Sequence, residues 1–90
     1  MLETELEIGN RLGLHARAAA KMVAVASRYD ARIRVRSGDR QPVDAKSIMG
    51  LLTLGAAQGT KLYISVDGDD EEQALAALTD LFERHFDEET

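Results

Sequence analysis

The chain of 90 residues contains no cysteine and no tryptophan, a single proline and only four aromatic side chains. The lack of cysteine excludes a disulfide framework, a thiolate zinc site and a cysteine nucleophile, and it fits a reducing compartment. No apolar run approaches the roughly 18 residues that a membrane-spanning helix needs. The first residues also lack the basic and apolar regions of a secretory signal. We therefore expect one cytoplasmic domain over residues 1–90, with no direct membrane insertion.

Positive charge is scarce in the second half of the chain. The net charge of the whole chain is −5, which argues against general nucleic-acid binding. Residues 1–46 contain nine Lys/Arg and six Asp/Glu, a balance of +3, whereas residues 47–90 contain two and ten, a balance of −8. The tail Asp87-Glu88-Glu89 is interpreted as solvated surface. An acidic body with a basic patch suits an anionic ligand or an acidic protein partner.

Hydrophobic residues alternate with a period of two in four segments and follow helical spacing in three others. Strands are expected over residues 2–8, 31–36, 40–43 and 60–67, and helices over residues 16–28, 48–54 and from about 70 to 86. Each strand is apolar on one side only, so one face of the sheet should carry helices and the other should meet water. The sequence predicts a two-layer α+β fold with the element order βαββαβα.

Three local features refine this fold prediction. Pro42 cannot donate a ladder hydrogen bond, so the third strand should lie at an edge of the sheet. Asp70 and Gln73 have the spacing of a capping box at the start of the third helix. The arginines at 32, 34 and 36 could form an RNA platform, but only Tyr63 is expected as a stacking aromatic on the open face. We interpret that row as solvated surface.

The two histidines differ in their surroundings. His85 is expected in the last turn of the third helix, where the helix dipole favours a cation, and it is interpreted as structural. His15 follows Gly13-Leu14 and comes directly before a predicted helix. The free N–H groups of Ala16, Arg17 and Ala18 should therefore point toward its ring, and the Arg17 guanidinium adds a bidentate phosphate donor. This arrangement suits a phosphoryl group carried on a histidine nitrogen.

Other chemistries fit the residues less well. A hydrolytic triad would need a nucleophile and an orienting acid near His15, and we find no such constellation in the sequence. A metal site would need further ligands at ligand spacing, and the neighbourhood of His15 in the sequence is basic. No glycine-rich phosphate loop with a lysine is present. We expect no metal and no cofactor.

The predicted helix from residue 48 to 54 is very apolar for its length. Ser47 is a favourable N-cap residue for it. Seven residues cannot bury all five of the large apolar side chains in this helix, so part of it is expected to be exposed; these are Ile48, Met49, Leu51, Leu52 and Leu54. An exposed set that includes Met49 is typical of an adaptable docking surface.

The segments Gly13-Leu14-His15-Ala16-Arg17 and Ser47-Ile48-Met49-Gly50-Leu51-Leu52 together resemble HPr, the histidine-containing phosphocarrier family of the phosphoenolpyruvate-dependent sugar phosphotransferase system. The resemblance covers essentially the whole chain, including its length, element order and motif spacing. It implies an open-faced β-sandwich with sheet order 1-4-2-3 and three helices on one face. It also implies a likeness in function: a monomeric covalent carrier that is not itself an enzyme.

The same resemblance implies roles for particular residues. His15 would accept a phosphoryl group on its δ1 nitrogen from phospho-Enzyme I and pass it to a sugar-specific IIA component, with Arg17 stabilising the charge in transfer. Ser47 matches a regulatory serine that an HPr kinase/phosphorylase modifies. The shared docking face of the family would be formed by five residues: Ala20, Lys21, Ile48, Met49 and Leu52.

One position departs from the family pattern, because Ala18 stands where proline usually follows the arginine. Proline in the first helical turn presets φ and lacks a donor, whereas alanine restores an N–H. A nitrogen-branch or other regulatory paralogue, acting by phosphorylation-dependent target binding, is therefore an alternative to the sugar-uptake carrier. A generic ligand-binding or RNA-binding α+β module is a third reading.

Overall fold

The computed structural model describes residues 1–88. A four-stranded antiparallel sheet has the order β1-β4-β2-β3. The strands are β1 (Leu2–Glu7), β2 (Arg32–Ser37), β3 (Val43–Asp44) and β4 (Lys61–Asp67). The helices are α1 (Ala16–Ala26), α2 (Ile48–Thr53) and α3 (Glu71–Glu83), followed by a short 3-10 turn, η1 (His85–Asp87). The predicted element order and sheet order are confirmed.

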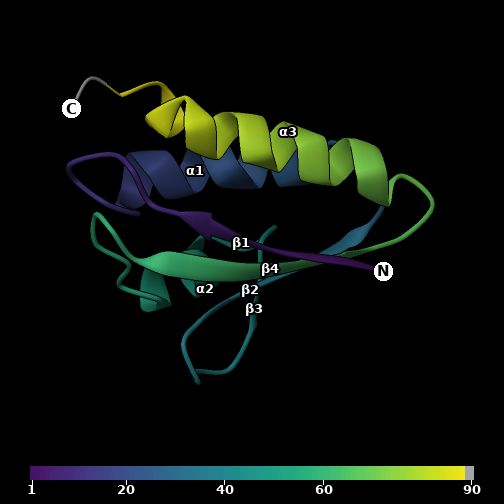
Figure 1. Cartoon of the computed structure of the whole chain (residues 1–90), viewed down its shortest axis with the longest axis horizontal. Helices are drawn as coiled ribbons and strands as arrows, with labels where there is room; N and C mark the ends of the chain where they lie inside the picture. Colours follow the sequence, from purple (N-terminus) through teal and green to yellow (C-terminus); the bar gives the residue numbers. More distant parts are fainter. Residues whose placement is uncertain (89–90) are drawn as a thin grey trace.

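Two layers build the molecule. In Figure 1, α1 and α3 run side by side over one face of the sheet, and α2 lies toward the β3 side, where it packs against α1 and β3. The alternation of the strands explains this arrangement, because Ile33, Ile64 and Val66 point between the layers and are buried. The helices contribute Met22, Leu78 and other apolar side chains to the same core.

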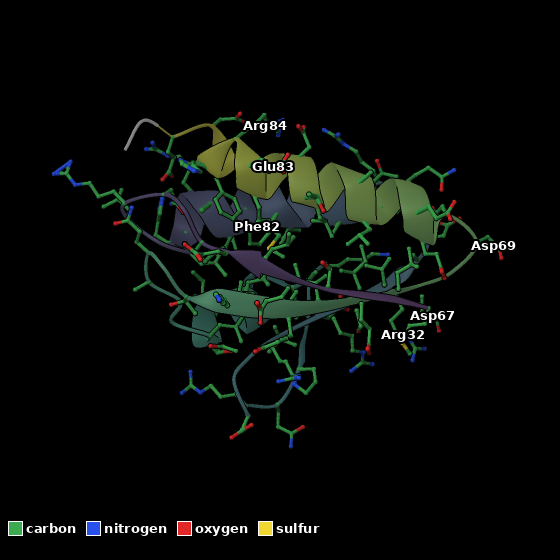
Figure 2. All side chains as sticks on the ribbon, viewed as in Figure 1. Arg32, Asp67, Asp69, Phe82, Glu83 and Arg84 are labelled. Carbon is green, nitrogen blue, oxygen red and sulfur yellow. The ribbon has the colours of Figure 1, made fainter. Side chains whose placement is uncertain are left out.

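The open face of the sheet carries the charged positions of the strands. Arg34 of β2 and Glu3 of β1 flank Ser65 of β4 in register. At the end of the sheet Arg32 is paired in register with Asp67, and Figure 2 shows both side chains there. Tyr63 is 39% exposed on this face and is covered by the guanidinium of Arg36, 4.4 Å from the ring centroid. Tyr63 is thus the one aromatic of the described open face, as expected, and Arg36 already stacks on it.

Several element boundaries differ from the expectation. The third strand covers Val43–Asp44 rather than residues 40–43, because Arg40 belongs to the turn that its N–H makes with Ser37 O at 3.1 Å. The strand begins only after Pro42 and lies at the sheet edge, as the missing donor requires. The first helix ends at Ala26 rather than Arg28, with Ser27 as its C-cap.

The predicted capping box at Asp70 is wrong. Asp70 is the N-cap residue of α3, but its side chain makes no cap hydrogen bond. Its two carboxylate oxygens instead accept from the N–H groups of Asp30 and Ala31, both at 2.9 Å. Asp70 therefore joins the start of α3 to the segment that leads into β2, a contact between residues about 40 positions apart.

The chain leaves the helical path after Glu83. His85, Phe86 and Asp87 all adopt left-handed backbone conformations, with φ of 53°, 57° and 62°. His85 therefore lies beyond α3 rather than in its last turn. Phe86, the last residue of the expected third helix, is fully buried, but it reaches the core from η1.

Candidate functional site

His15 caps the N-terminus of α1. Its backbone is extended (φ −84°, ψ −178°), and its carbonyl accepts the Ala19 N–H at 2.8 Å. Its Nδ1 accepts the Arg17 N–H at 3.3 Å. The first-turn N–H groups of a helix have no partner within it, so this end of α1 favours an anion beside the ring. The His15 side chain is 27% exposed, which leaves it within reach of a partner protein.

The other edge of the ring faces the C-terminal tail. His15 Nε2 contacts Glu88 Oε2. The second oxygen of that carboxylate, Oε1, accepts a hydrogen bond from Asn10 Nδ2 at 2.7 Å, and the same amide donates to Gly13 O at 2.8 Å. Asn10 is fully buried, and the Glu88 side chain is 12% exposed. An acid thus lies directly against the candidate acceptor.

The surroundings of Glu88 favour its ionised form. Burial by itself would raise the pKa of this carboxyl, but the hydrogen bonds from Asn10 and His15, with the charges of His15 and Arg17, outweigh it. The pKa of Glu88 is therefore lowered. A carboxylate in this state can only accept hydrogen bonds from its neighbours.

The residues beside His15 divide between surface and core. Ala16 and Arg17 are exposed, whereas Ala18 is fully buried. The side chain at position 18 therefore packs into the domain, and the Arg17 guanidinium is free to meet a ligand from solvent. The structure places the predicted His15, Arg17 and first-turn amides together at one end of α1.

Comparison with known proteins decides the family. Residues 2–84 match the family model described as "PTS HPr component phosphorylation site". The chain belongs to the HPr family. It is 48% identical to the phosphocarrier protein HPr of Xylella fastidiosa over 90 residues, which is all of both chains. Two solved structures from Thermoanaerobacter tengcongensis, both 49% identical, are similar. One is of HPr-C-His (TM-score 0.93, covering 100% of both chains), and the other is of an HPr dimer (TM-score 0.77, covering 98% of this chain and 100% of that one).

HPr proteins are phosphocarriers of the phosphotransferase system and are not enzymes themselves. Two features of the described residues bear on other functions. Within residues 1–88, no three His, Asp or Glu side chains lie close enough to hold a metal ion. In the same residues, no helix is both long enough and apolar enough to cross a membrane.

Ser47 caps the N-terminus of α2, as its residue type predicted. Its Oγ accepts the Gly50 N–H at 3.1 Å, and its carbonyl accepts the Leu51 N–H at 3.0 Å. The side chain is partly exposed. Ser47 is therefore both a structural cap and an accessible hydroxyl in this HPr protein.

The expected docking residues are distributed over α1 and α2. Met49 is 69% exposed and Ile48 is 38% exposed, while Leu52 is half-buried. Ala20 is exposed on α1. Lys21 is already engaged, because its Nζ donates to Phe86 O at 2.9 Å and lies 3.7 Å from Asp87 Oδ2. An apolar patch on α2 is thus available, whereas the cation of Lys21 is shared with the tail.

Three residues near the site were missed by reasoning from the sequence. Glu88 was taken for solvated surface, which is wrong, because its carboxylate lies against His15. Asn10, in the loop before His15, was not singled out, and it is fully buried. Leu12, three residues before His15, is 71% exposed. The tail residue Glu89 lies outside the described residues.

Proposed function

We propose that this chain carries a phosphoryl group on the Nδ1 atom of His15, received from phospho-Enzyme I and donated to IIA components of sugar permeases. The observation that carries the proposal is the division of the two ring nitrogens. Nε2 is occupied by Glu88, whereas Nδ1 meets only a long 3.3 Å contact from the Arg17 N–H at the positive end of α1. A phosphoryl group on Nδ1 would take over that N–H as a donor to its oxygens.

Arg17 and the first-turn amides would hold the transferred group. The N–H groups of Ala16, Arg17 and Ala18 offer fixed donors, and fixed donors are most effective where charge develops during transfer. The exposed guanidinium of Arg17 can add two parallel hydrogen bonds to phosphate oxygens. Its charge also balances part of the dianion.

The docking face would consist of the exposed end of α1 and the apolar side of α2. We assign to it Ala20, Lys21, Ile48, Met49 and Leu52. A partner that covers these residues must offer apolar groups for the α2 side chains and acidic groups for the basic ones. Lys21 would first have to exchange its contacts with the tail for contacts with the partner.

We also assign a regulatory role to Ser47, as a phosphorylation site for an HPr kinase/phosphorylase. The hydroxyl is partly exposed and lies beside Ile48 and Met49. A phosphate there would add about −1.5 to −2 charge at the edge of the apolar docking patch. Docking of Enzyme I would weaken as a result.

Radiolabelled phosphoenolpyruvate with Enzyme I tests the carrier function. The wild-type protein should become labelled on a bond that is acid-labile and alkali-stable, as expected for a phosphohistidine and not for a serine ester. The His15→Ala variant should remain folded and unlabelled. Labelling of that variant at the wild-type rate would exclude His15 as the acceptor, and no label on the wild type would leave only a binding module.

A nitrogen-branch or other regulatory carrier is the alternative, because Ala18 stands where the family usually has proline. Transfer of the label to a permease-linked IIA component would favour the sugar branch. We place the protein in the cytoplasm as a monomer. Light scattering at working concentration tests whether the protein is a monomer, since a similar protein has been solved as a dimer.

A further inference from the structure

The last described residues form a strap that returns from α3 to the His15 site. We define this strap as Arg84–Glu88. In Figure 1 this end of the chain reaches the same end of the molecule as the loop before α1, and in Figure 2 Phe82 points from α3 toward the sheet while Arg84 points away. Phe86 anchors the strap in the core, with its ring centroid 4.9 Å from that of Phe82. The left-handed turn at three successive residues without glycine shows that the packing imposes this path.

Contacts on both sides hold the strap in place. Lys21 of α1 donates to Phe86 O at 2.9 Å. On the other side the ring of His85 covers Gly9, where an added β-carbon would lie 2.6 Å from the ring. The strap therefore lies between α1 and the loop that follows β1. Its last residue, Glu88, lies beside His15.

The carboxylate of Glu88 is oriented by a buried amide. Asn10 Nδ2 donates both to Gly13 O at 2.8 Å and to Glu88 Oε1 at 2.7 Å, so the backbone carbonyl fixes which end of the amide faces the acid. With Oε1 held in this way, Oε2 is directed at His15 Nε2. The contact is part of a network that includes a fully buried side chain, unlike a surface ion pair.

We propose that Glu88 is a positioning residue for phosphoryl transfer, which keeps the imidazole proton of His15 on Nε2 and leaves the lone pair on Nδ1. The inference rests on the proposed function, in which His15 is the acceptor. The partner of each ring nitrogen then determines whether that nitrogen carries the proton. Nε2–H donates to an oxygen that can only accept, and Nδ1 accepts the Arg17 N–H at 3.3 Å.

The assigned tautomer lets the transfer proceed without loss of a proton from the ring. The Nδ1 lone pair forms the new N–P bond, and the bond between phosphorus and the donor atom of phospho-Enzyme I breaks, its electron pair staying with that donor atom. The His15 ring becomes formally cationic, with Nε2–H still directed at the carboxylate. Glu88 thus stabilises the charge that develops on the ring, while Arg17 and the helix amides face the phosphoryl oxygens on the other nitrogen. In the reverse step the same proton stays in place.

Nitrogen NMR of the unphosphorylated protein tests the assignment directly. At about pH 8, above the ordinary titration range of imidazole, wild-type His15 should be predominantly protonated on Nε2. In Glu88→Gln, one oxygen cannot serve both Asn10 and His15, so the preference for Nε2–H should fall. Transfer from phospho-Enzyme I should slow by about 10- to 100-fold, the range found when a group that orients a metal-bound histidine is lost. Glu88→Asp keeps the acid, so it should restore part of the preference for Nε2–H and part of the transfer rate.

Asp87→Asn is the matched control, because it removes the same charge from the same strap. Asp87 contacts Lys21 and Arg84 rather than His15. Its variant should keep the wild-type tautomer, and its transfer should not be slower than that of the wild type, because loss of this contact only frees Lys21 for docking. The proposal is overturned if Glu88→Gln keeps the wild-type tautomer, if it transfers at the wild-type rate or faster, or if Asp87→Asn slows transfer equally. A wild-type protein with Nε2–H but no label on His15 would instead overturn the proposed function.

Discussion

A β-carbon on Gly13 would lie 2.5 Å from the carbonyl oxygen of Ala56, the same oxygen that accepts the Leu14 N–H at 2.8 Å. Gly13 also has a φ of +72°. The loop before His15 is therefore held against the segment after α2 by a backbone contact that leaves no room for a side chain. The position of the His15 ring depends on this contact, because only one residue separates them.

Gly13→Ala should be strongly destabilising. The left-handed conformation alone costs about 1–2 kcal/mol, and the clash with Ala56 adds to it. Gly38→Ala is the control, because Gly38 has a φ of +58° but nothing within 4 Å of an added β-carbon. Urea unfolding should give a clearly larger loss of stability for Gly13→Ala. Equal losses would mean that the loop moves away from Ala56 at no cost.

Asp70→Ala should destabilise the fold by about 1–3 kcal/mol, since it removes the acceptor of two backbone N–H groups. The capping box expected from the sequence would instead make Gln73 important. Gln73 is exposed, so Gln73→Ala should change the free energy of unfolding by less than about 0.5 kcal/mol. A similar loss of stability in both variants would instead support the capping box.

The architecture was predictable because its signals are local. Alternation in β2 and β4 and the helical spacing of α1 and α3 set the layers, and Pro42 marked the edge strand. The Asp70 contact with Asp30 and Ala31 was not predictable, because a carboxylate can cap its own helix or bind a distant backbone, and only the packing decides.

Only the part of the candidate site at the start of α1 could be predicted from the sequence. His15 and Arg17 are close in sequence, and the start of a helix explains their arrangement. Glu88 lies 73 positions from His15 and no periodicity connects them. Its position depends on the left-handed backbone of His85, Phe86 and Asp87, which cannot be inferred from an acidic tail.

Arg17 should affect transfer much more than stability. Arg17→Ala should lower the rate of His15 phosphorylation while leaving the melting temperature nearly unchanged, because the side chain is exposed. Arg17→Lys keeps the charge but loses the planar fork, so its transfer rate should lie between those of the wild type and Arg17→Ala. Arg28→Ala, an exposed cation beyond the other end of α1, is the control and should transfer normally. A wild-type rate in Arg17→Ala would make Arg17 a surface residue only.

Glu88 should contribute to the acid sensitivity of the fold. Its pKa lies below the ordinary value of 4.5, so its stabilisation is complete above that pH and is lost as the pH falls through the lower folded value. Unfolding of Glu88→Gln should therefore depend less on pH over this acid range than unfolding of the wild type. Glu83→Gln, at an exposed site on α3, should follow the wild type. Parallel curves for Glu88→Gln and wild type would contradict the contact with Asn10 and His15.

A negative charge at position 47 should weaken docking without lowering the stability of the fold. Ser47→Ala removes the hydrogen bond to the Gly50 N–H and should cost about 1 kcal/mol. Ser47→Asp supplies another favoured N-cap residue, and its charge suits the start of a helix, so its stability should equal or exceed that of Ser47→Ala. Urea unfolding of the two variants measures this difference.

The effect on docking should run the other way. A charge at position 47 lies beside Ile48 and Met49, which are 38% and 69% exposed. A partner that buries these side chains would also have to desolvate the charge without pairing it, which opposes binding. The apparent affinity for phospho-Enzyme I, measured from initial rates of His15 phosphorylation, should therefore be weaker for Ser47→Asp than for Ser47→Ala. Equal affinities would leave Ser47 as a helix cap alone, because the charge would then lie outside the docking face. A lower stability of the Asp variant would show that the start of α2 does not accept an anion, and weaker docking could then be explained by a damaged helix.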